Sequence, residues 1–379
     1  MRMLMIGGCP GRFICDAHHM AWRLDGEIEL VGGCFSSDPE RNRQAAERLG
    51  VDSARVSDSW QSAIAREAAL PPARRAHFVA SITPNRLHAP VAVHAMRHGF
   101  PVLSDKPLCY SLAEAEELER VQAETGLPFA LTHNYSGYAM VKQARELISS
   151  GRLGRVLKAV VEYPQGGVAA GMAQGRADAL RDPGKRTERS ACFSDIGVHA
   201  AQLLEYVSGI VIQQVCADCT TIVPGRELED DASVLLRLSG GAKGVLLASQ
   251  IASGEENPLS LRVWCEHGGL EWRQMEPNSL MVKWRDRPME IRRSGRYFDE
   301  ELPATRAATR LPAGHPEGYL EAFATIYARF ARQLRARAEG RQPQPEDLDV
   351  PGLADGMRGM RITAAVVDSA AVESRWMAV

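Results

Sequence analysis

The chain contains 379 residues, and 45 Lys and Arg against 47 Asp and Glu leave a formal net charge of −2. At roughly 100–200 residues per domain, this length predicts two domains. A hydrophobic fraction of 45% and a charged fraction of 24% are typical of globular proteins and exclude intrinsic disorder or a small disulfide-stapled fold. The near-neutral charge without a basic tail argues against nucleic acid as a partner. No apolar stretch is long enough to predict a membrane span.

The eight cysteines predict neither disulfides nor a metal site. Most stand in apolar segments, as expected of small buried residues in a cytoplasmic protein. Cys216 and Cys219 form one CxxC pair, but no second pair of zinc ligands follows at a suitable spacing. The apolar run over residues 1–6 ends at Gly7, too early for a signal peptide. We therefore expect a cytoplasmic protein that holds no metal.

Strand and helix signals alternate over the first third of the chain. The expected strands cover residues 3–6, 28–35, 77–82, 101–104 and 129–132, and the helices between them cover 14–24, 39–49, 89–98 and 112–124. Strands separated by helices of this length are typical of βαβ units. The pattern predicts an α/β domain with a doubly wound parallel sheet over residues 1–133.

After residue 133, strand-like runs follow one another without helices between them. They cover residues 211–223, 232–238, 243–251, 260–266, 270–275 and 280–284, with short glycine-rich links that suit hairpins. Helices are expected at 138–150, 196–207, 317–337 and 354–369. This pattern predicts an α+β domain over residues 134–379, with a large open and mainly antiparallel sheet.

A glycine-rich turn, Gly7-Gly8-Cys9-Pro10-Gly11, follows the first expected strand. Such a turn lets backbone N–H groups approach a pyrophosphate at a helix N-terminus. Cys9 and Arg12 stand where a strict G-x-G-x-x-G would have its later glycines, so a plain tight turn is an alternative of equal weight. The position at the first βα junction favours the cofactor.

The second expected strand ends near Ser36, Ser37 and Asp38, where a dinucleotide-binding fold contacts the adenosine ribose. A carboxylate there accepts hydrogen bonds from the ribose hydroxyls and repels a 2′-phosphate. Asp38 stands two residues after Ser36 and Arg41 lies nearby, which leaves NAD and NADP both open. Capping of the helix that begins at Pro39 is an equal alternative for Asp38.

Two polar segments are expected at the carboxyl edge of the same sheet, where open α/β sheets bind ligands. They are Thr83-Pro84-Asn85-Arg86-Leu87-His88 and Ser104-Asp105-Lys106-Pro107. The alternatives are a plain turn and a solvated lysine. Lys106 directly follows a buried strand, which is an unusual place for a lysine without a function.

The second domain contains Asp195 and His199, at positions i and i+4 of an expected helix. This spacing places both side chains on one face. A histidine beside a carboxylate accepts a proton near neutral pH. Taken alone, the pair is more often structural than catalytic.

Together these motifs resemble the Gfo/Idh/MocA family, the glucose–fructose oxidoreductase and inositol dehydrogenase group. The resemblance rests on the glycine-rich turn, on Thr83-Pro84-Asn85-x-x-His88, on Asp105-Lys106-Pro107-Leu108 and on Asp195-x-Gly197-x-His199. Further stretches, residues 132–138, 162–165 and 314–319 among them, are similar to the sugar-dehydrogenase branch that includes levoglucosan dehydrogenase.

The resemblance implies a Rossmann domain, a C-terminal sheet that builds homodimers or homotetramers, and NAD(P)-dependent hydride transfer at a hydroxyl or keto group of a sugar, aminosugar or cyclitol. NAD is the expected cofactor and NADP the alternative. The implied cofactor-binding residues are Gly7, Gly8, Gly11, Phe13, Ile14, Ser36, Ser37, Asp38, Arg41, Thr83, Asn85, His88, Asp105 and Lys106.

The resemblance also implies three catalytic residues. Lys106 would orient the reacting oxygen, His199 would be the general base in oxidation and the acid in reduction, and Asp195 would hold the substrate and tune His199. The implied residues of the sugar pocket also include Tyr135, Gln165 and His315. The alternatives are an NAD-recycling glycosidase or lyase that oxidises its sugar transiently, and a non-catalytic NAD-binding regulator.

Two departures from the family pattern concern the site. Asp105 is one methylene shorter than the glutamate common in relatives. The segment over residues 185–194, usually glycine-rich, is basic and bulky here. We expect Arg186 and Arg189 to be solvated loop charges or subunit contacts; recognition of an anionic sugar is the alternative.

Overall fold

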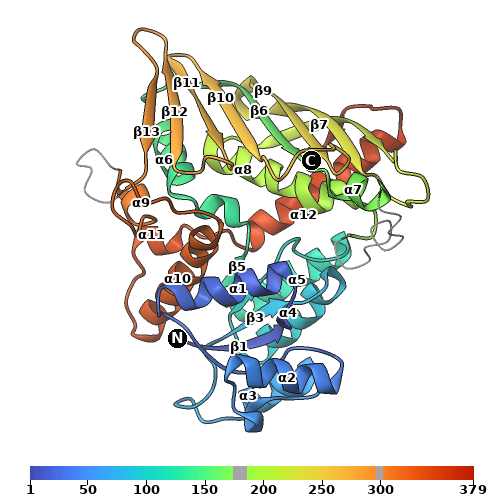
Figure 1. The fold of residues 1–379 in the computed structure, drawn as a ribbon, viewed down its shortest axis with the longest axis vertical. Coiled ribbons are helices and arrows are strands. Elements are labelled where there is room, and N and C mark those ends of the chain that lie inside the picture. Colours follow the sequence, from blue (N-terminus) through green and yellow to red (C-terminus); the bar gives the residue numbers. More distant parts are fainter. Residues whose placement is uncertain (174–185, 296–301) are drawn as a thin grey trace. The chain divides into compact units, whose positions relative to one another are not determined.

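The computed structural model describes residues 1–173, 186–295 and 302–379 (Figure 1). They form two compact units, the first made of Met1–Gly137 and Tyr319–Met357 and the second of Tyr138–Gly318 and Arg358–Val379. This division differs from the predicted domains of 1–133 and 134–379, because residues 319–357 belong to the first unit. No helix in the described parts of the chain is both long enough and apolar enough to cross a membrane.

The first unit is built on a parallel five-stranded sheet in the order β2-β1-β3-β4-β5. Its strands are β1 (Arg2–Gly7), β2 (Glu29–Cys34), β3 (Phe78–Ile82), β4 (Val102–Ser104) and β5 (Phe129–Leu131). The chain order reverses between β1 and β3, and open α/β sheets bind ligands at such a switch point. The predicted doubly wound sheet is confirmed.

Helices connect these strands (Figure 1). They are α1 (Phe13–Leu24), α2 (Pro39–Leu49), α3 (Trp60–Ala68), α4 (His88–Arg97) and α5 (Leu112–Thr125), with short 3-10 helices at Ser53–Arg55, Asn85–Leu87 and Asn134–Gly137. Helix α3 is absent from the sequence-based prediction. It begins where the Ser59 side chain accepts a hydrogen bond from the Ser62 N–H at 3.2 Å, an N-cap that the sequence pattern around it did not reveal.

Helix α10 (Tyr319–Ala338) joins the first unit through its apolar face. Its buried residues Phe323, Tyr327 and Phe330 belong to the same core as Met3 and Phe78 of the sheet. The rings of Phe330 and Phe78 meet edge to face with centroids 5.6 Å apart. This burial explains why the helix belongs to a sheet whose strands all lie much earlier in the sequence. The short helix α11 (Pro345–Leu348) follows it.

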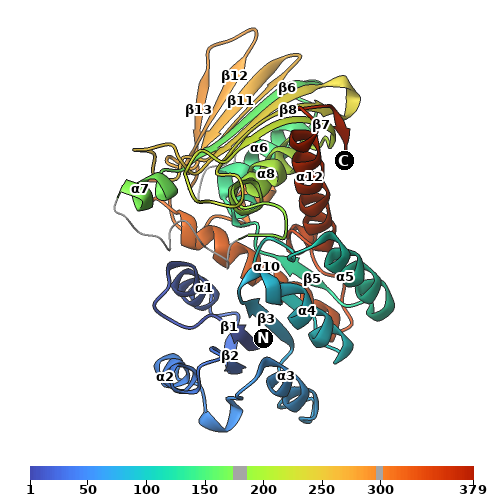
Figure 2. The ribbon, with the colours of Figure 1, turned by 90° about the vertical axis from the view of Figure 1, so that its right-hand side faces the viewer.

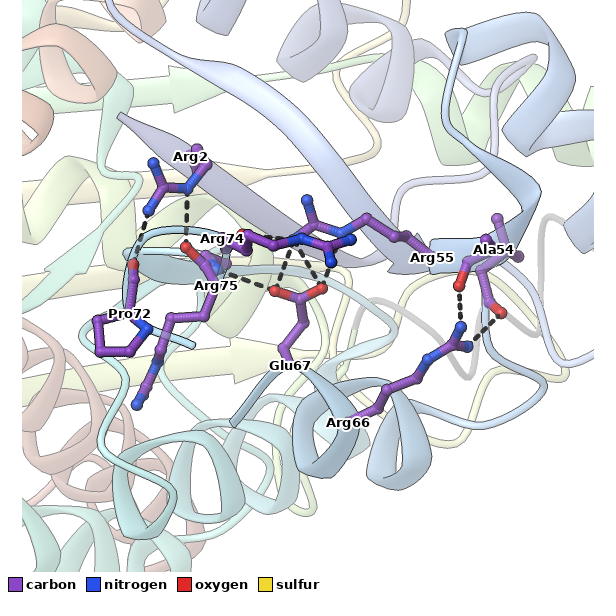
Figure 3. Close-up of polar contacts among 10 residues, drawn as sticks. Arg2, Ala54, Arg55, Arg66, Glu67, Pro72, Arg74 and Arg75 are labelled. Atoms are coloured by element: carbon purple, nitrogen blue, oxygen red, sulfur yellow. Dashed lines mark hydrogen bonds and ion pairs between the residues drawn. The ribbon is translucent and has the colours of Figure 1, made fainter. Parts of the chain in front are cut away.

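A buried carboxylate fastens the segment that leads into β3. The Glu67 side chain is 4% exposed and accepts hydrogen bonds from Arg55 at 2.7–3.0 Å and from the Ala76 N–H at 2.9 Å. From β1, Arg2 donates to the carbonyl oxygens of Arg75 and Pro72 at 2.8 and 3.0 Å (Figure 3). These contacts hold the chain before β3 against β1.

The second unit is built on a nine-stranded sheet in the order β13-β12-β11-β10-β6-β9-β8-β7-β14. The strands are β6 (Val156–Pro164), β7 (Ile212–Thr220), β8 (Asp231–Leu238), β9 (Lys243–Ser249), β10 (Ser260–Cys265), β11 (Gly268–Arg273), β12 (Ser279–Trp284), β13 (Glu290–Arg293) and β14 (Met377–Ala378). Only β6 and β9 pair in parallel, and all other neighbours are antiparallel. The predicted mainly antiparallel sheet is confirmed.

Helices cover one face of this sheet, where α6 (Ala139–Ser149), α8 (Val198–Ser208) and the second-unit part of α12 (Leu353–Ala371) lie (Figure 2). The remaining helices are α7 (Gly167–Ala173) and α9 (Pro303–Arg306). Residues that alternate along the strands, such as Leu246 and Trp272, point into this buried layer. The opposite face is open, and exposed apolar side chains such as Leu235 and Ile291 lie on it.

Candidate active site

The turn after β1 has the shape of a phosphate-binding loop without its strict sequence. Gly7, Gly8 and Gly11 have φ angles of 77°, 71° and 101°. A Cβ atom on Gly7 would lie 2.2 Å from the Ile82 carbonyl oxygen, whereas a Cβ on Gly11 would meet no atom within 4 Å. The backbone is therefore tight against the end of β3 and open at the N-terminus of α1. This geometry fits a pyrophosphate at the helix N-terminus.

Two side chains hold this turn in shape. His19 Nε2 lies 2.6 Å from the Gly8 carbonyl oxygen. Burial lowers the pKa of His19, so the imidazole is neutral at neutral pH and donates this hydrogen bond through Nε2–H. The Gly11 N–H donates to the Asp16 carboxylate at 3.1 Å. Neither side chain belongs to a sequence motif, because only contacts within the fold show their role.

The first two residues of α1 differ in exposure. Phe13 is 75% exposed, an unusual value for a large apolar ring, and its centroid lies 5.7 Å from that of Tyr319. Ile14 is half-buried. The predicted contact of both residues with the cofactor stays a prediction.

The segment after β2 contains a helix cap. Asp38 Oδ1 accepts a hydrogen bond from the Arg41 N–H at 2.8 Å, and Pro39 opens α2. The Asp38 N–H in turn donates to Ser36 Oγ at 3.2 Å. The capping alternative therefore describes what Asp38 does here. Ribose contacts by Ser36, Ser37, Asp38 or Arg41 stay predictions.

His88 joins the two polar segments at the carboxyl edge of the sheet. Its side chain is buried, with Nδ1 2.6 Å from the Pro107 carbonyl oxygen and Nε2 2.9 Å from the Thr83 carbonyl oxygen. Both partners are acceptors, so His88 bridges the chain after β3 and the chain after β4. Asn85, also buried, lies in the short helix between them. The structure therefore brings Thr83, Asn85 and His88 to the segment of Lys106.

Asp105 is a buried carboxylate at this edge of the sheet. Its Oδ1 accepts hydrogen bonds from the Lys106 N–H at 2.9 Å and from Thr132 Oγ1 at 2.5 Å, and lies 3.6 Å from His18 Nε2. Burial alone would raise the pKa of Asp105, but the contacts with His18 and Thr132 hold it below its ordinary value. Asp105 is therefore an ionised buried group that fixes the backbone of Lys106. The Lys106–Pro107 peptide bond is cis.

His133 is a buried neighbour of Lys106. Burial lowers the pKa of His133 to about 3, and the charge of Lys106 adds to this effect. The imidazole is thus neutral at neutral pH. The sequence analysis quoted His133 in a family stretch but assigned it no role. Tyr135, predicted to line the sugar pocket, is buried and its ring centroid lies 6.5 Å from that of Tyr319.

In the second unit, Asp195 and His199 lie on one continuous helical segment, but the segment is not a regular α-helix. Residues Phe193–Gly197 form a π turn, after which α8 begins at Val198. Such turns are rare and often mark functional sites. The Glu229 carboxylate accepts hydrogen bonds from Ser190 Oγ at 2.6 Å and from the Phe193 N–H at 3.0 Å. It therefore satisfies backbone and side-chain donors at the start of the segment.

Polar side chains gather around these two residues. The Asp195 Oδ2 atom accepts a hydrogen bond from Gln250 Nε2 at 3.1 Å. The ring of Tyr163 lies 6.3 Å from that of His199, centroid to centroid. Asn257 Oδ1 accepts from Tyr163 Oη at 2.8 Å and from Gln165 Nε2 at 2.5 Å. The structure thus links the predicted residue Gln165 to the neighbourhood of His199 through Asn257 and Tyr163.

Gln250 and Asn257 escaped the sequence analysis. Both residues lie between β9 and β10, far along the sequence from Asp195 and Tyr163, which they contact. Isolated amides in such positions have no sequence signature. Tyr163 lies within residues 162–165, a stretch that resembles the family, and this resemblance is the sequence signal that points to it.

His315 lines a cavity of the second unit. Its ring is exposed, with Nδ1 3.3 Å from the Pro312 carbonyl oxygen. The cavity has a volume of about 650 Å³, and Arg293, Ser294 and Asn278 also line it. The described lining contains none of Asp195, His199 and Gln165, so the predicted place of His315 in one sugar pocket with these residues gains no support.

The basic segment forms ion pairs within the second unit. Arg186 Nη1 lies 2.8 Å from Glu227 Oε2, and Arg189 Nη2 lies 2.6 Å from Asp368 Oδ1. Both pairs are partly or largely exposed, as the loop-charge expectation requires. Lys185 lies outside the described residues. Within the described ranges, no group of three or more His, Cys, Asp and Glu side chains has the arrangement of a metal site.

Comparison with known proteins identifies both parts of the chain. A family profile described as "Oxidoreductase family, NAD-binding Rossmann fold" matches residues 1–133, and the GFO/IDH/MocA C-terminal domain matches residues 141–271. The crystal structure of an oxidoreductase from Sinorhizobium meliloti is 38% identical, with a TM-score of 0.89, over 100% of this chain and 99% of that one.

Two further relatives carry more specific names. An inositol dehydrogenase homolog from Azotobacter vinelandii, crystallised with NAD+, is 29% identical with a TM-score of 0.91 over 100% of this chain and 97% of that one; it was also crystallised with NADH and myo-inositol. Levoglucosan dehydrogenase of Pseudarthrobacter phenanthrenivorans is 24% identical over 99% of this chain and 98% of its own length. The expected resemblance is confirmed: the chain belongs to the Gfo/Idh/MocA family and is an oxidoreductase with an NAD-binding Rossmann domain.

Proposed function

We propose that this oxidoreductase transfers a hydride between nicotinamide and a secondary hydroxyl or keto group of a sugar or cyclitol. The observation that carries the proposal is the polar cluster of the second unit, in which Asp195, His199 and the amide of Gln165 gather with Tyr163 and Asn257. Carboxylate, imidazole and amide groups are suited to a ligand rich in hydroxyls. The names of the relatives, inositol dehydrogenase homolog and levoglucosan dehydrogenase, support the same substrate class.

In this proposal each residue has one task. The bound nicotinamide supplies the hydride acceptor in oxidation and the donor in reduction. His199 takes the proton of the reacting hydroxyl in oxidation and returns it in reduction. Lys106, whose backbone is fixed by Asp105, orients the reacting oxygen and stabilises its negative charge. Asp195 accepts a hydrogen bond from the substrate and places a carboxylate on the same helical segment as His199.

For the cofactor we propose NAD in preference to NADP. The open glycine turn fits the pyrophosphate that both cofactors share, so the choice depends on the segment after β2. The Asp38 carboxylate is exposed there and brings a negative charge that disfavours a 2′-phosphate. Arg41, three residues later, has the opposite effect, so we expect a moderate preference.

We further propose that the enzyme is a homodimer or homotetramer that uses the open face of the second-unit sheet. Strand register aligns a row of side chains across this face: Cys216, Leu235, Val245, Val160, Arg262, Glu271, Met281 and Ile291. Most are apolar, and Leu235 and Ile291 are more than half exposed. A second copy would bury this row. Size-exclusion chromatography with light scattering tests it, and a monomer at micromolar concentration would contradict it.

The function is tested by a screen of monosaccharides, aminosugars and inositols with NAD and with NADP, read by the absorbance of the reduced cofactor. One equivalent of NADH per substrate consumed is the expected result, with His199→Ala as the inactive control. Product formed with only catalytic NAD would establish the lyase alternative instead. Cofactor binding without turnover of any substrate would favour the regulator.

A further inference from the structure

Asp195 stands at the end of a chain of polar contacts that starts from a buried arginine. Gln250 Nε2 donates to Asp195 Oδ2 at 3.1 Å, and Gln250 Oε1 accepts from Arg226 Nη2 at 3.4 Å. Arg226 is in turn paired with Asp230, whose Oδ2 lies 3.5 Å from Arg226 Nε. The side chains of Arg226 and Asp230 are 8% and 0% exposed. The second unit therefore contains a polar relay in the order Asp230, Arg226, Gln250, Asp195, buried at its Asp230 end and partly buried at Asp195.

Backbone hydrogen bonds hold the relay in place. Asp230 accepts hydrogen bonds from the Ile222 and Val223 N–H groups at 2.8 and 3.0 Å, which fixes the turn that carries Arg226. The Gln250 N–H donates to the Asp230 carbonyl oxygen at 2.8 Å, which fixes the backbone of Gln250 as well. Asp230 thus holds both the Arg226 side chain and the backbone of Gln250.

The charges at its two ends determine how the Gln250 amide is turned. With Nε2 toward the Asp195 carboxylate and Oε1 toward the Arg226 guanidinium, both contacts are favourable. The opposite orientation would place oxygen against carboxylate and NH2 against guanidinium, so both contacts would be repulsive. The amide therefore presents a donor to Asp195 in a single orientation, and a donor favours the ionised carboxylate.

Further carboxylates lie near the start of the same helical segment. Carboxylates close enough to raise the pKa of the buried Cys192 thiol, in addition to its burial, are those of Glu229, Asp195, Asp231 and Asp230. Charged or titratable groups near Asp195 also include Arg226, reached through Gln250, and His199 on α8. The Gln250 donor therefore faces a carboxylate in a part of the unit that is rich in acids.

We infer that Gln250, oriented by Arg226, is a positioning residue that keeps the Asp195 carboxylate ionised and in one orientation as the acceptor of a substrate hydroxyl. This inference rests on the proposed role of Asp195. An ionised Asp195 accepts hydrogen bonds and repels anions. The substrate group at this position is therefore a neutral hydroxyl and not a carboxylate or phosphate.

The decisive variant is Gln250→Glu, which keeps the size of the side chain and replaces the NH2 donor with an oxygen. Two carboxylates in this contact cannot both ionise readily, so they share a proton. We expect the acid limb of the pH profile of kcat/KM to move up by roughly one to two pH units, with activity recovered only above that limb. We also expect the free energy of unfolding in urea to be closest to that of the wild type at low pH, where the shared proton is bound. It should fall below the wild-type value as the pH rises.

The matched control is Gln214→Glu on β7. Gln214 Oε1 accepts from Arg237 Nη1 at 2.8 Å, so this change also converts an amide beside an arginine into a carboxylate, but the partner is exposed and Asp195 is not involved. We expect its pH profile and the pH dependence of its stability to match those of the wild type. The stability measurement needs no substrate, and the activity profile uses whichever substrate the screen identifies.

Two further outcomes separate the inference from the proposed function. If Gln250→Glu and Gln214→Glu show the same pH dependence of stability and activity, the inference is overturned while the role of Asp195 stands. If Asp195→Asn retains wild-type kcat/KM, the proposed function of Asp195 fails, whatever Gln250 does. Loss of activity in Asp195→Asn together with the shifted limb in Gln250→Glu supports both.

Discussion

The Nδ1 atom of His18 lies 2.9 Å from the hydroxyl oxygen of Tyr327, although 309 residues separate them in the sequence. Burial raises the pKa of Tyr327 well above its ordinary value, so its hydroxyl stays protonated and donates to Nδ1. The other ring nitrogen of His18 then carries its proton toward Asp105, 3.6 Å away. Helices α1 and α10 are thereby tied to the segment that carries Lys106.

This relationship predicts that Tyr327→Phe weakens the first unit. The variant keeps the packing of the ring but leaves a buried nitrogen of His18 without its donor, which costs about 1–3 kcal/mol. We expect a lower midpoint of urea unfolding and a reduced kcat. Tyr110→Phe is the control. In the described contacts Tyr110 donates a hydrogen bond through its backbone N–H to Glu114, which the change to Phe leaves in place. Equal stability of the two variants would show that the hydroxyl of Tyr327 contributes nothing.

The proposed general base predicts the effect of His199→Ala. General acid–base catalysis contributes about 10²–10⁴-fold, so kcat should fall by that factor. NADH affinity, measured by its fluorescence on binding, should stay nearly unchanged because His199 lies in the second unit, outside the NAD-binding residues 1–133. An unaltered kcat would remove His199 from the mechanism.

The segment after β2 predicts the result of Ser36→Asp. A carboxylate at this position would accept hydrogen bonds from the ribose hydroxyls and repel a 2′-phosphate, whereas the Asp38 carboxylate caps α2. The preference for NAD, measured as a ratio of kcat/KM values, should increase. A wild-type enzyme that already used NADP a hundredfold better would instead assign Arg41 to the 2′-phosphate.

The buried His133 predicts how stability depends on pH. Its pKa is lowered to about 3 in the folded chain, whereas an unfolded histidine titrates near 6.5. The unfolded state therefore binds one more proton between these values, and stability falls as the pH decreases through this window, by at most about 1.4 kcal/mol per pH unit. His133→Gln should reduce the slope of the unfolding free energy against pH. Urea unfolding at several pH values between roughly 4 and 7, which lie within or near this window, measures that slope.

His77 offers a comparison for the same experiment. Burial and the charge of Arg2 lower its pKa to about 4, so His77→Gln should flatten the dependence over a narrower window. A wild-type slope in both variants would mean that neither histidine is neutral in the folded state.

The ion pair of Arg189 predicts a negative result. Because Arg189 is held by Asp368 and both side chains are about half exposed, Arg189→Ala should leave KM unchanged for neutral and acidic sugars and change stability by less than about 1 kcal/mol. A KM that rose for an acidic sugar alone would restore the hypothesis of anion recognition.

Much of the fold follows from local patterns in the sequence. Alternating apolar runs and helical segments predicted the parallel sheet, and glycine-linked strands predicted the antiparallel one, because burial imposes a period of two or 3.6 residues on any chain that forms these elements. The turn at Gly7, the segment at Asp105 and the pair Asp195 and His199 were recognisable for a related reason: each combines a short motif with a position at the end of a strand or on a helix.

Only the tertiary structure decided how distant residues meet. It placed α10 in the first unit, since its apolar face packs on strands from the other end of the chain. It also paired His18 with Tyr327 and Gln250 with Asp195, contacts between single polar side chains that leave no periodic trace in the sequence. Hydrophobic burial is repeated along an element and can be read locally, whereas one hydrogen bond between remote segments depends on where the whole fold brings them.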